Sequence, residues 1–192
     1  MRKDILQPDQ LRVLFSEQEE WYCFAWQFMA ATGMRPGEVY GLKWSDIDGS
    51  ILHIRRSLND RGIITQGKNE NAIRTFVLAP TVMDILSAQK ERTEALKSVW
   101  VFPDNTGAPS QRKAYKAWKS FAEKKDIKEP PYAFRRTFIS IVKNAMPAEM
   151  VKALVGHSES MDTFGVYGRP VNGEMEESAK IVDITVKRVL ER

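Results

Sequence analysis

The sequence has 192 residues, 43% hydrophobic and 28% charged, which is enough to bury one core, so we expect a single domain. The net charge is only +4, and a single cysteine, Cys23, rules out a disulfide framework and favours a reducing compartment. The longest apolar run, residues 21–32, is too short to cross a bilayer, and the N-terminus lacks the apolar core of a signal peptide. These features exclude membrane-spanning and disulfide-rich secreted classes and predict a cytoplasmic protein.

The pattern of apolar residues predicts a mainly helical fold with one small sheet. Helices are expected over residues 8–15, 19–31, 36–42, 81–96, 110–125, 131–145, 147–155 and 174–190. Three short β-rich segments, ILHIRR, GIITQG and IRTFVL, lie between the third and fourth of these helices and are separated by turn-forming residues. They predict a three-stranded antiparallel meander. The expected fold class is therefore mainly α with a small antiparallel β-sheet.

The corner between the second and third helices, in the sequence ATGMRPGEVYG, carries the first candidate site residue. Arg35 directly precedes Pro36, and a residue before proline is pushed away from helical geometry, so we expect Arg35 at a fixed corner. Its guanidinium keeps its charge and matches phosphate oxygens in shape, and Glu38 could hold the far side of the fork. The alternative is an arginine–glutamate capping pair without a chemical role.

Three further features hold candidate residues, and each has a plain structural alternative. Lys68 stands between two predicted strands, where a lysine is usually a solubilising charge. In YAFRRTF, Tyr132 and Arg135 are i,i+3 neighbours on one face of a helix. In VGHSESMDTFGVYGR, His157 precedes Tyr167 by ten residues. Taken alone, this histidine would be a core or cap residue and this tyrosine an amphipathic surface group.

Positive charge is concentrated in residues 111–143, which contain ten lysines and arginines but three acids. Tyr115 and Trp118 are interleaved with these cations, a combination that suits a polyanion such as DNA. The predicted nucleic-acid-binding residues are Lys113, Lys116, Lys119 and Arg136. The alternative is a solvated lysine face without a partner.

Taken together and in this order, the motifs resemble one family. Their sequence is an arginine in TGMRPGE, a lysine six residues before RTFVL, an arginine in YAFRRTF, and GHS with a tyrosine ten residues after its histidine. This order and spacing resemble the catalytic domain of the tyrosine recombinase, or phage integrase, family. The resemblance runs from about Gln7 to Arg169, and Arg74 and Thr75 fall where the family places them after Lys68.

The resemblance implies an electrostatic role for four of the candidates. Breaking a phosphodiester places charge on the non-bridging oxygens, and fixed donors aimed at that charge are usually the largest catalytic term. Arg35 and Arg135 would clamp these oxygens, and His157 would add a further donor. Glu38 would buttress the site.

Two more candidates take bond-making roles by the same resemblance. Lys68 would protonate the 5′ oxygen as it leaves, and Tyr167 would form a 3′-phosphotyrosine that stores the bond energy for rejoining. No metal or other cofactor is implied, because the sequence has no ligand cluster and the arginines supply the electrostatic stabilisation that a metal would give.

One position departs from the family pattern. The family usually has histidine, sometimes lysine, three residues before the second arginine, and this sequence has Tyr132 there. A tyrosine hydroxyl can donate a hydrogen bond, but it titrates at about pH 10 and is a poor base at neutral pH. Three alternatives therefore stand: an active recombinase, a catalytically impaired DNA-binding member of the same fold, and a helical interaction protein with a solvated basic face.

The resemblance also implies the domain organisation and the partners. We expect a catalytic domain over residues 1–172 and a C-terminal tail helix over residues 173–192, without the N-terminal core-binding domain that is usual in the family. The tail carries an apolar stripe at helical spacing, formed by Met175, Ala179, Val182, Val186 and Val189. The stripe packs either on its own domain or, as in many recombinases, on a neighbouring protomer. The expected partners are double-stranded DNA with recombination sites and other protomers of a synaptic complex, and no membrane.

Overall fold

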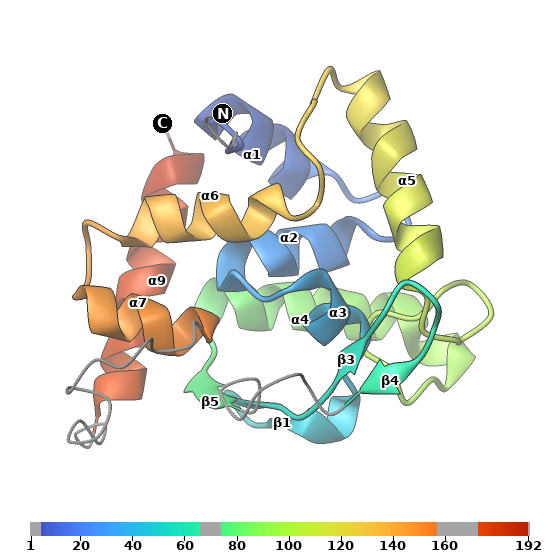
Figure 1. Cartoon of the computed structure of the whole chain (residues 1–192), viewed down its shortest axis with the longest axis horizontal. Helices are drawn as coiled ribbons and strands as arrows, with labels where there is room; N and C mark the ends of the chain where they lie inside the picture. The colour runs from blue at the N-terminus through green and yellow to red at the C-terminus, as the bar shows by residue number, and fades with distance from the viewer. Residues whose placement is uncertain (1–4, 66–73, 157–172, 192) are drawn as a thin grey trace.

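The computed structural model describes residues 5–65, 74–156 and 173–191 (Figure 1). Its α-helices are α1 (Pro8–Ser16), α2 (Cys23–Thr32), α3 (Pro36–Tyr40), α4 (Pro80–Thr93), α5 (Gln111–Lys124), α6 (Ala133–Val142), α7 (Ala148–Val155) and α9 (Glu174–Leu190). Each predicted helix is present, with ends displaced by a few residues, and α2 begins at Cys23 rather than at residue 19. The mainly helical fold class is confirmed.

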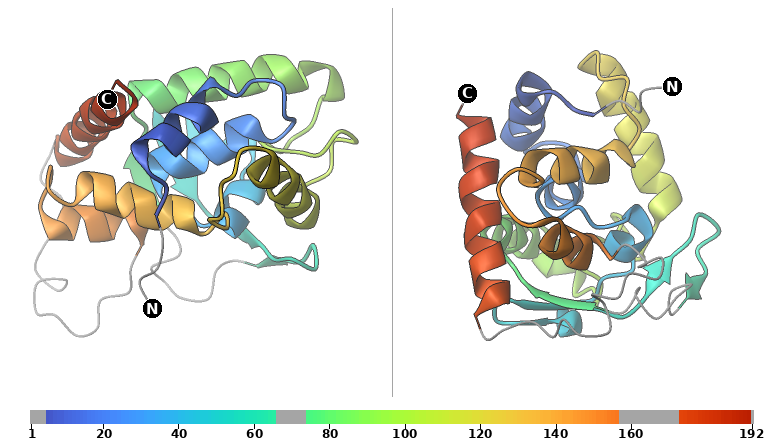
Figure 2. Two further views of the ribbon diagram at one scale, coloured as in Figure 1. Left: turned by 90° about the horizontal axis from the view of Figure 1, so that it is seen from above. Right: turned by 60° about the vertical axis from the view of Figure 1, so that its left-hand side comes forward.

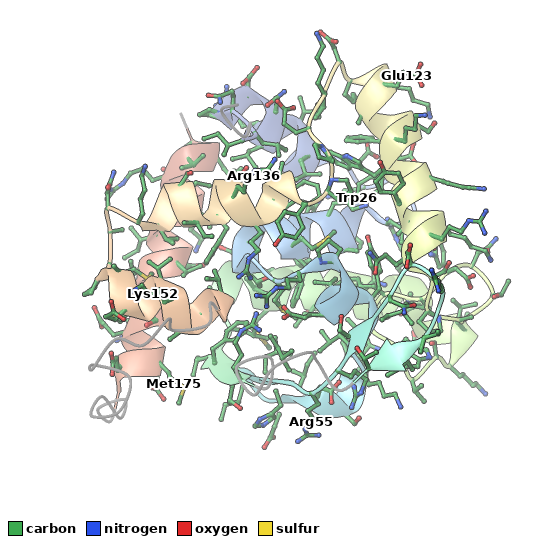
Figure 3. All side chains as sticks on the ribbon, viewed as in Figure 1. Trp26, Arg55, Glu123, Arg136, Lys152 and Met175 are labelled. Atoms are coloured by element: carbon green, nitrogen blue, oxygen red, sulfur yellow. The ribbon has the colours of Figure 1, made fainter. Side chains whose placement is uncertain are left out.

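Helix α2 forms the centre of the molecule, with α1, α4 and α6 packed around it (Figures 1 and 2). All ten of its residues are buried, as expected for a helix that is apolar on every side. Trp26, which Figure 3 labels, belongs to α2 and lies edge-on to Trp118 of α5, with ring centroids 5.1 Å apart. Trp118 in turn packs edge-on against Phe134 of α6, at 4.7 Å. These aromatic contacts fix the middle of α5 and the start of α6 relative to α2.

The strands form two separate antiparallel units. A three-stranded sheet has the order β1-β2-β5, formed by Ile47–Asp48, Ile51–Ile54 and Arg74–Val77. A two-stranded hairpin pairs β3 (Ser57–Leu58) with β4 (Ile64–Thr65). In the sheet, β2 pairs directly with β5, so that Leu52 lies opposite Phe76.

The predicted meander is therefore wrong in its strand order. The segment GIITQG supplies β4, which pairs with β3 instead of lying between ILHIRR and IRTFVL. The physical reason is burial, because Leu52, Ile54 and Phe76 face the core. Ile63 and Ile64 are 55% and 46% exposed and offer no buried face to a central strand.

Helix α9 packs along its own chain, against α1, α4, α6 and β5 (Figure 2). From its apolar stripe, Ala179, Val182 and Val186 are buried, whereas Met175 at the start of the helix is exposed. Of the two alternatives that the sequence left open, the structure has the stripe on its own domain. Docking of this helix on another protomer remains a prediction without support from these contacts.

A carboxylate on α9 hydrogen-bonds to the start of α4. The Asp183 Oδ1 atom accepts hydrogen bonds from the backbone N of Thr81, at 2.8 Å, and from its hydroxyl, at 2.6 Å. Thr81 lies in the first turn of α4, where backbone N–H groups have no partner within the helix. Asp183 therefore caps one helix from another. Burial acts to raise the pKa of Asp183, but hydrogen bonds from Lys187 and Thr81 outweigh it and lower that pKa below its ordinary value of 3.8.

We expect Asp183→Ala to lower the free energy of unfolding by about 1–2 kcal/mol, the usual cost of a lost helix cap. Since the folded-state pKa is depressed, this contribution is fully present above pH 3.8 and is lost as the pH falls below it. Urea denaturation at neutral and acidic pH measures both effects. Lys180→Ala, an exposed change on the same helix, is the control. An equal loss in both variants, or a loss independent of pH, would contradict the capping role.

Candidate active site

The corner between α2 and α3 frames the site. Helix α2 ends at Gly33, which has φ 66°, and a Cβ atom there would lie 2.4 Å from Cδ1 of Phe138 on α6. Both the left-handed backbone and the close approach of α6 therefore require glycine. Arg35 is extended, with φ −71° and ψ 145°, as predicted for a residue before Pro36, which begins α3. The corner is thus held between α2, α3 and α6.

Both ends of the Arg35 guanidinium are held by the folded chain. Nη1 donates to Glu38 Oε1 at 2.9 Å, and Nη2 donates to the carbonyl oxygen of Gly156 at 2.9 Å. The backbone N of Arg35 also donates to Glu38 Oε2, at 3.0 Å. The predicted contact between Arg35 and Glu38 is present. The Arg35 side chain is still 36% exposed, so that the positioned charge remains open to a ligand.

A second arginine, Arg74 of β5, holds the same carboxylate. Its Nη1 and Nη2 atoms donate to the two oxygens of Glu38, each at 3.0 Å, and its Nε donates to the carbonyl oxygen of Leu154 at 2.9 Å. The sequence marked Arg74 only by its place in the family pattern and assigned it no role. The missed signal is strand alternation, which puts Arg74 on the same face of β5 as the buried Phe76. A charged residue on an inward face needs a partner.

Arg135 of α6 lies deepest in the site and is 2% exposed. Its Nη1 donates to the carbonyl oxygen of Gly33 at 2.9 Å. Its Nη2 is buried and has no hydrogen-bond partner among the residues that the structure describes. Burial, and then the nearby charge of Arg35, lower the pKa of Arg135 to about 10, so the guanidinium stays charged at neutral pH.

Together these groups create a local excess of positive charge. Burial acts to raise the pKa of Glu38, but hydrogen bonds and charge from Arg74, followed by Arg35, lower it, so the carboxylate is ionised. One carboxylate thus faces three guanidiniums. A buried charged donor without a partner is costly, and an anion with several oxygens would satisfy it. The arrangement therefore suits a phosphate-sized anion between Arg35 and Arg135.

Of the other residues predicted to be catalytic, the structure describes Tyr132 alone. Tyr132 precedes α6, is 48% exposed, and lines a small cleft together with Pro36, the residue that follows Arg35. Lys68, His157 and Tyr167 lie outside the described residues. The structure therefore brings Arg35, Glu38 and Arg135 together, with Tyr132 at their edge.

The predicted nucleic-acid-binding cations lie on two helices. Lys113, Lys116 and Lys119 are exposed on α5, and Arg136 is partly buried on α6, where Figure 3 labels it. Lys113 forms an ion pair with Asp104, whose carboxylate also accepts from the backbone N–H groups of residues 106 and 108. Burial acts to raise the pKa of Asp104, but Lys113 and these neighbours lower it to about 2. Lys113 is therefore partly neutralised, whereas Lys116 and Lys119 are open to a polyanion.

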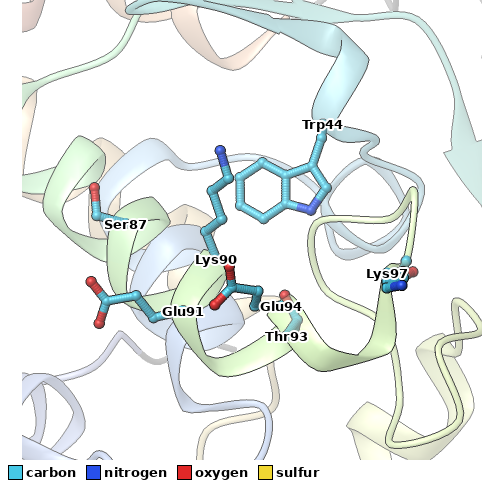
Figure 4. A pocket seen from close by; sticks show the side chains of 8 residues that line it. Trp44, Ser87, Lys90, Glu91, Thr93, Glu94 and Lys97 are labelled. Carbon is cyan, nitrogen blue, oxygen red and sulfur yellow. The ribbon is translucent and has the colours of Figure 1, made fainter.

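A cleft of about 430 Å³ lies away from the arginine corner, between Trp44 and α4 (Figure 4). It contains acids and bases in equal number, Lys90, Lys97, Glu91 and Glu94. Because these charges offset one another, the cleft lacks the excess positive charge of the arginine corner. Within the described ranges, no cluster of three or more His, Cys, Asp or Glu could hold a metal ion, and no helix is long and apolar enough to cross a membrane.

Comparison with known proteins decides the family. The family model described as "Phage integrase family" matches residues 4–172. The chain belongs to the phage integrase family. Prophage integrase IntR of Escherichia coli (strain K12) is 22% identical over 212 residues, which covers 95% of this chain and 51% of that protein. The chain thus spans about half the length of the curated relatives that it matches.

Solved structures of integrases share the fold. The Tn1549 transposon integrase in complex with a circular intermediate DNA has a TM-score of 0.71 and 18% identity, covering 92% of this chain and 65% of that one. A lambda integrase tetramer bound to a Holliday junction has a TM-score of 0.60 and 14% identity, covering 86% of this chain and 51% of that one. At these identities the likeness establishes the fold, as the sequence motifs predicted.

We expect Arg135→Met to leave the free energy of unfolding unchanged or to raise it by about 1 kcal/mol, because it removes a buried charge whose Nη2 has no described partner. Among the described residues, the variant loses the hydrogen bond from Nη1 to the carbonyl oxygen of Gly33, and methionine fills the space of the arginine stem. Chemical denaturation in a buffer without multivalent anions measures the change.

Arg56→Met is the matched control. Arg56 forms an ion pair with Asp46, whose side chain is 1% exposed. Loss of the Arg56 guanidinium therefore leaves the buried Asp46 carboxylate with fewer hydrogen-bond donors. We expect this control to lose about 1–3 kcal/mol. A loss of the same size in Arg135→Met would show that the Arg135 charge is already compensated within the folded chain, and would contradict an open anion site.

Proposed function

We propose that this chain carries the catalytic activity of a tyrosine-type site-specific DNA recombinase, cleaving and rejoining strands through a 3′-phosphotyrosine intermediate. The observation that carries the proposal is the buried Nη2 of Arg135, a charged donor without a partner among the described residues. A non-bridging phosphate oxygen is a strong acceptor for such a donor. Family membership makes a phosphodiester of DNA the anion that fits best.

In this proposal the arginines supply fixed electrostatic stabilisation. Arg35 and Arg135 bind the non-bridging oxygens of the scissile phosphate, and the charge that develops there in the transition state strengthens both contacts. Glu38 holds Arg35 in place and, through Arg74, is itself held to β5. Because these donors are positioned before DNA arrives, little reorganisation is needed at the moment of reaction.

The bond-making roles rest on the family resemblance. The phenol oxygen of Tyr167 attacks the phosphorus and loses its proton to solvent, which forms the 3′-phosphotyrosine. The bond from phosphorus to the 5′ oxygen breaks, and Lys68 gives a proton to that oxygen as it leaves. His157 adds a hydrogen bond to the phosphate. Rejoining is the reverse, in which a 5′ hydroxyl attacks the phosphotyrosine and the phenol leaves, so that no external energy source is consumed.

We infer that the partners are double-stranded DNA and further copies of the recombinase. The lambda integrase structure is a tetramer bound to a Holliday junction, and the Tn1549 integrase is bound to a circular intermediate DNA. The exposed cations Lys116 and Lys119 on α5 support contact with the DNA backbone. Such a chain would act on DNA in the cytoplasm of a bacterial cell.

A second candidate is a DNA-binding member of the family with impaired catalysis, and Tyr132 is the observation that favours it. The family's usual histidine can take up and release a proton at neutral pH, whereas the exposed tyrosine at this position offers a hydroxyl for hydrogen bonding. Both candidates use the same arginine corner to bind phosphate. They differ in whether a covalent adduct forms.

We expect the wild-type chain to form a covalent adduct with nicked DNA duplexes that survives denaturant, and Tyr167→Phe to form none, because the phenol oxygen makes the bond. A random-sequence duplex pool supplies the substrate, and gel electrophoresis after denaturation separates the adduct. DNA affinity of the variant should stay within about twofold, since the change removes one hydroxyl and keeps the aromatic ring. Arg35→Ala should reduce adduct formation by about 100- to 1,000-fold.

An adduct that persists in Tyr167→Phe would assign the nucleophile elsewhere. DNA binding by the wild-type chain without any adduct would support the impaired, DNA-binding alternative.

A further inference from the structure

A small aromatic cleft lies beside the arginine corner, between α3, the start of α5 and the chain leading into α6. Its volume is about 180 Å³, and it is lined by three tyrosines, Tyr40, Tyr115 and Tyr132, together with three prolines and Gln111. We refer to it as the tyrosine cleft. Tyr40 is 3% exposed, whereas Tyr115 and Tyr132 are 54% and 48% exposed. The cleft therefore has a buried ring within its lining and two rings open to solvent.

The lining and the size of the tyrosine cleft favour a flat ring system. Tyrosine and proline rings offer flat apolar faces, and aromatic groups stack on such faces in preference to water. A closed cavity of about 150 Å³ accommodates a single benzene ring, so a cleft of about 180 Å³ has room for one base-sized ring.

The side chain of Gln111 requires a hydrogen-bond donor on the ligand. Gln111 is the first residue of α5 and lines the cleft, and its Oε1 is buried without a hydrogen-bond partner among the described residues. A buried acceptor left unpaired is costly, and an N–H group on a ligand would satisfy it. The ligand should therefore be a flat ring that carries an N–H donor.

The surroundings place this ring next to a phosphate. Pro36 of the cleft directly follows Arg35, and Tyr132 is three residues before Arg135, so the cleft borders the proposed phosphate site. Exposed cations, Arg112 and Lys116, flank Tyr115 on α5. Aromatic rings interleaved with cations are the chemistry that binds nucleic-acid strands with unstacked bases.

We propose that the tyrosine cleft binds one unstacked nucleobase of the DNA strand whose phosphate is held by Arg35 and Arg135. The proposal rests on the proposed function, because it takes the neighbouring anion to be a DNA phosphate. Each natural base has an N–H group for Gln111, so the cleft accepts any base and sets the position of the strand, not its sequence. A base held in this way fixes which phosphate reaches the two arginines.

The test compares two single-stranded probes with the same number of phosphates, oligothymidylate and a fully abasic oligonucleotide. Their phosphates contribute equally, so the difference in affinity reports the bases alone. We expect the wild-type chain to bind oligothymidylate about 5- to 100-fold more tightly, the range for stacking of one base on aromatic rings. Fluorescence anisotropy at low salt measures both dissociation constants.

Variants locate the effect. Tyr115→Ala and Gln111→Met should each remove most of the preference for oligothymidylate, whereas Tyr115→Phe should keep it because the ring remains. Lys116→Ala is the matched control, one residue away. It should lower the affinity for both probes by the same factor, because the lysine contacts phosphates and not bases. Tyr115 is half exposed, so its loss leaves the core intact, and melting temperatures check this.

The outcomes separate this proposal from the proposed function. Equal affinity of the wild-type chain for both probes, or a preference that survives both Tyr115→Ala and Gln111→Met, would overturn the tyrosine cleft as a base site while covalent adduct formation stands. Failure to bind either probe, together with absence of an adduct on duplex DNA, would overturn both.

Discussion

The site depends on the hydrogen bonds that Arg35 and Arg74 donate to the buried carboxylate of Glu38. The carboxylate accepts from Arg35 at the start of α3 and from both Nη atoms of Arg74 on β5, so one ionised group joins the helical corner to the sheet. Its own burial is tolerated because two guanidiniums satisfy it. Without it, Arg35 and Arg74 would repel each other across a poorly solvated gap, and the corner would lose its geometry.

We propose that the third guanidinium, that of Arg135, turns this structural cluster into a binding site. Glu38 is already shared between two arginines. Among the described residues, Arg135 therefore has one backbone carbonyl as a partner, that of Gly33, and its Nη2 has none. The chain thus holds a buried charge that its own described residues do not neutralise, a cost that natural proteins accept at functional sites. Aromatic packing of Trp118 against Phe134 holds α6, and so Arg135, in that position.

Local physical rules made much of this predictable from the sequence. The restriction on a residue before proline placed Arg35 at the corner, and helical periodicity placed the helices, including α9. Strand order failed, because pairing of β2 with β5 depends on burial across the molecule and not on adjacency in the chain. The role of Arg74 was missed for the same reason, since its partner Glu38 is distant in sequence. The packing of α9 could not be decided from an apolar stripe, which any complementary surface satisfies.

The roles of Lys68, His157 and Tyr167 rest on resemblance, and these residues lie outside the described part of the chain.

We propose that Arg35 and Arg135 form a phosphate site before DNA binds. A crystal of the chain soaked with tungstate, a phosphate-shaped anion with strong anomalous scattering, tests it most directly. We predict an anomalous peak at the corner, with tungstate oxygens within hydrogen-bond distance of Arg135 Nη2 and of Arg35. Tungstate bound only at the exposed lysines of α5, with Arg135 Nη2 still unpaired or paired to the protein's own chain, would contradict the claim.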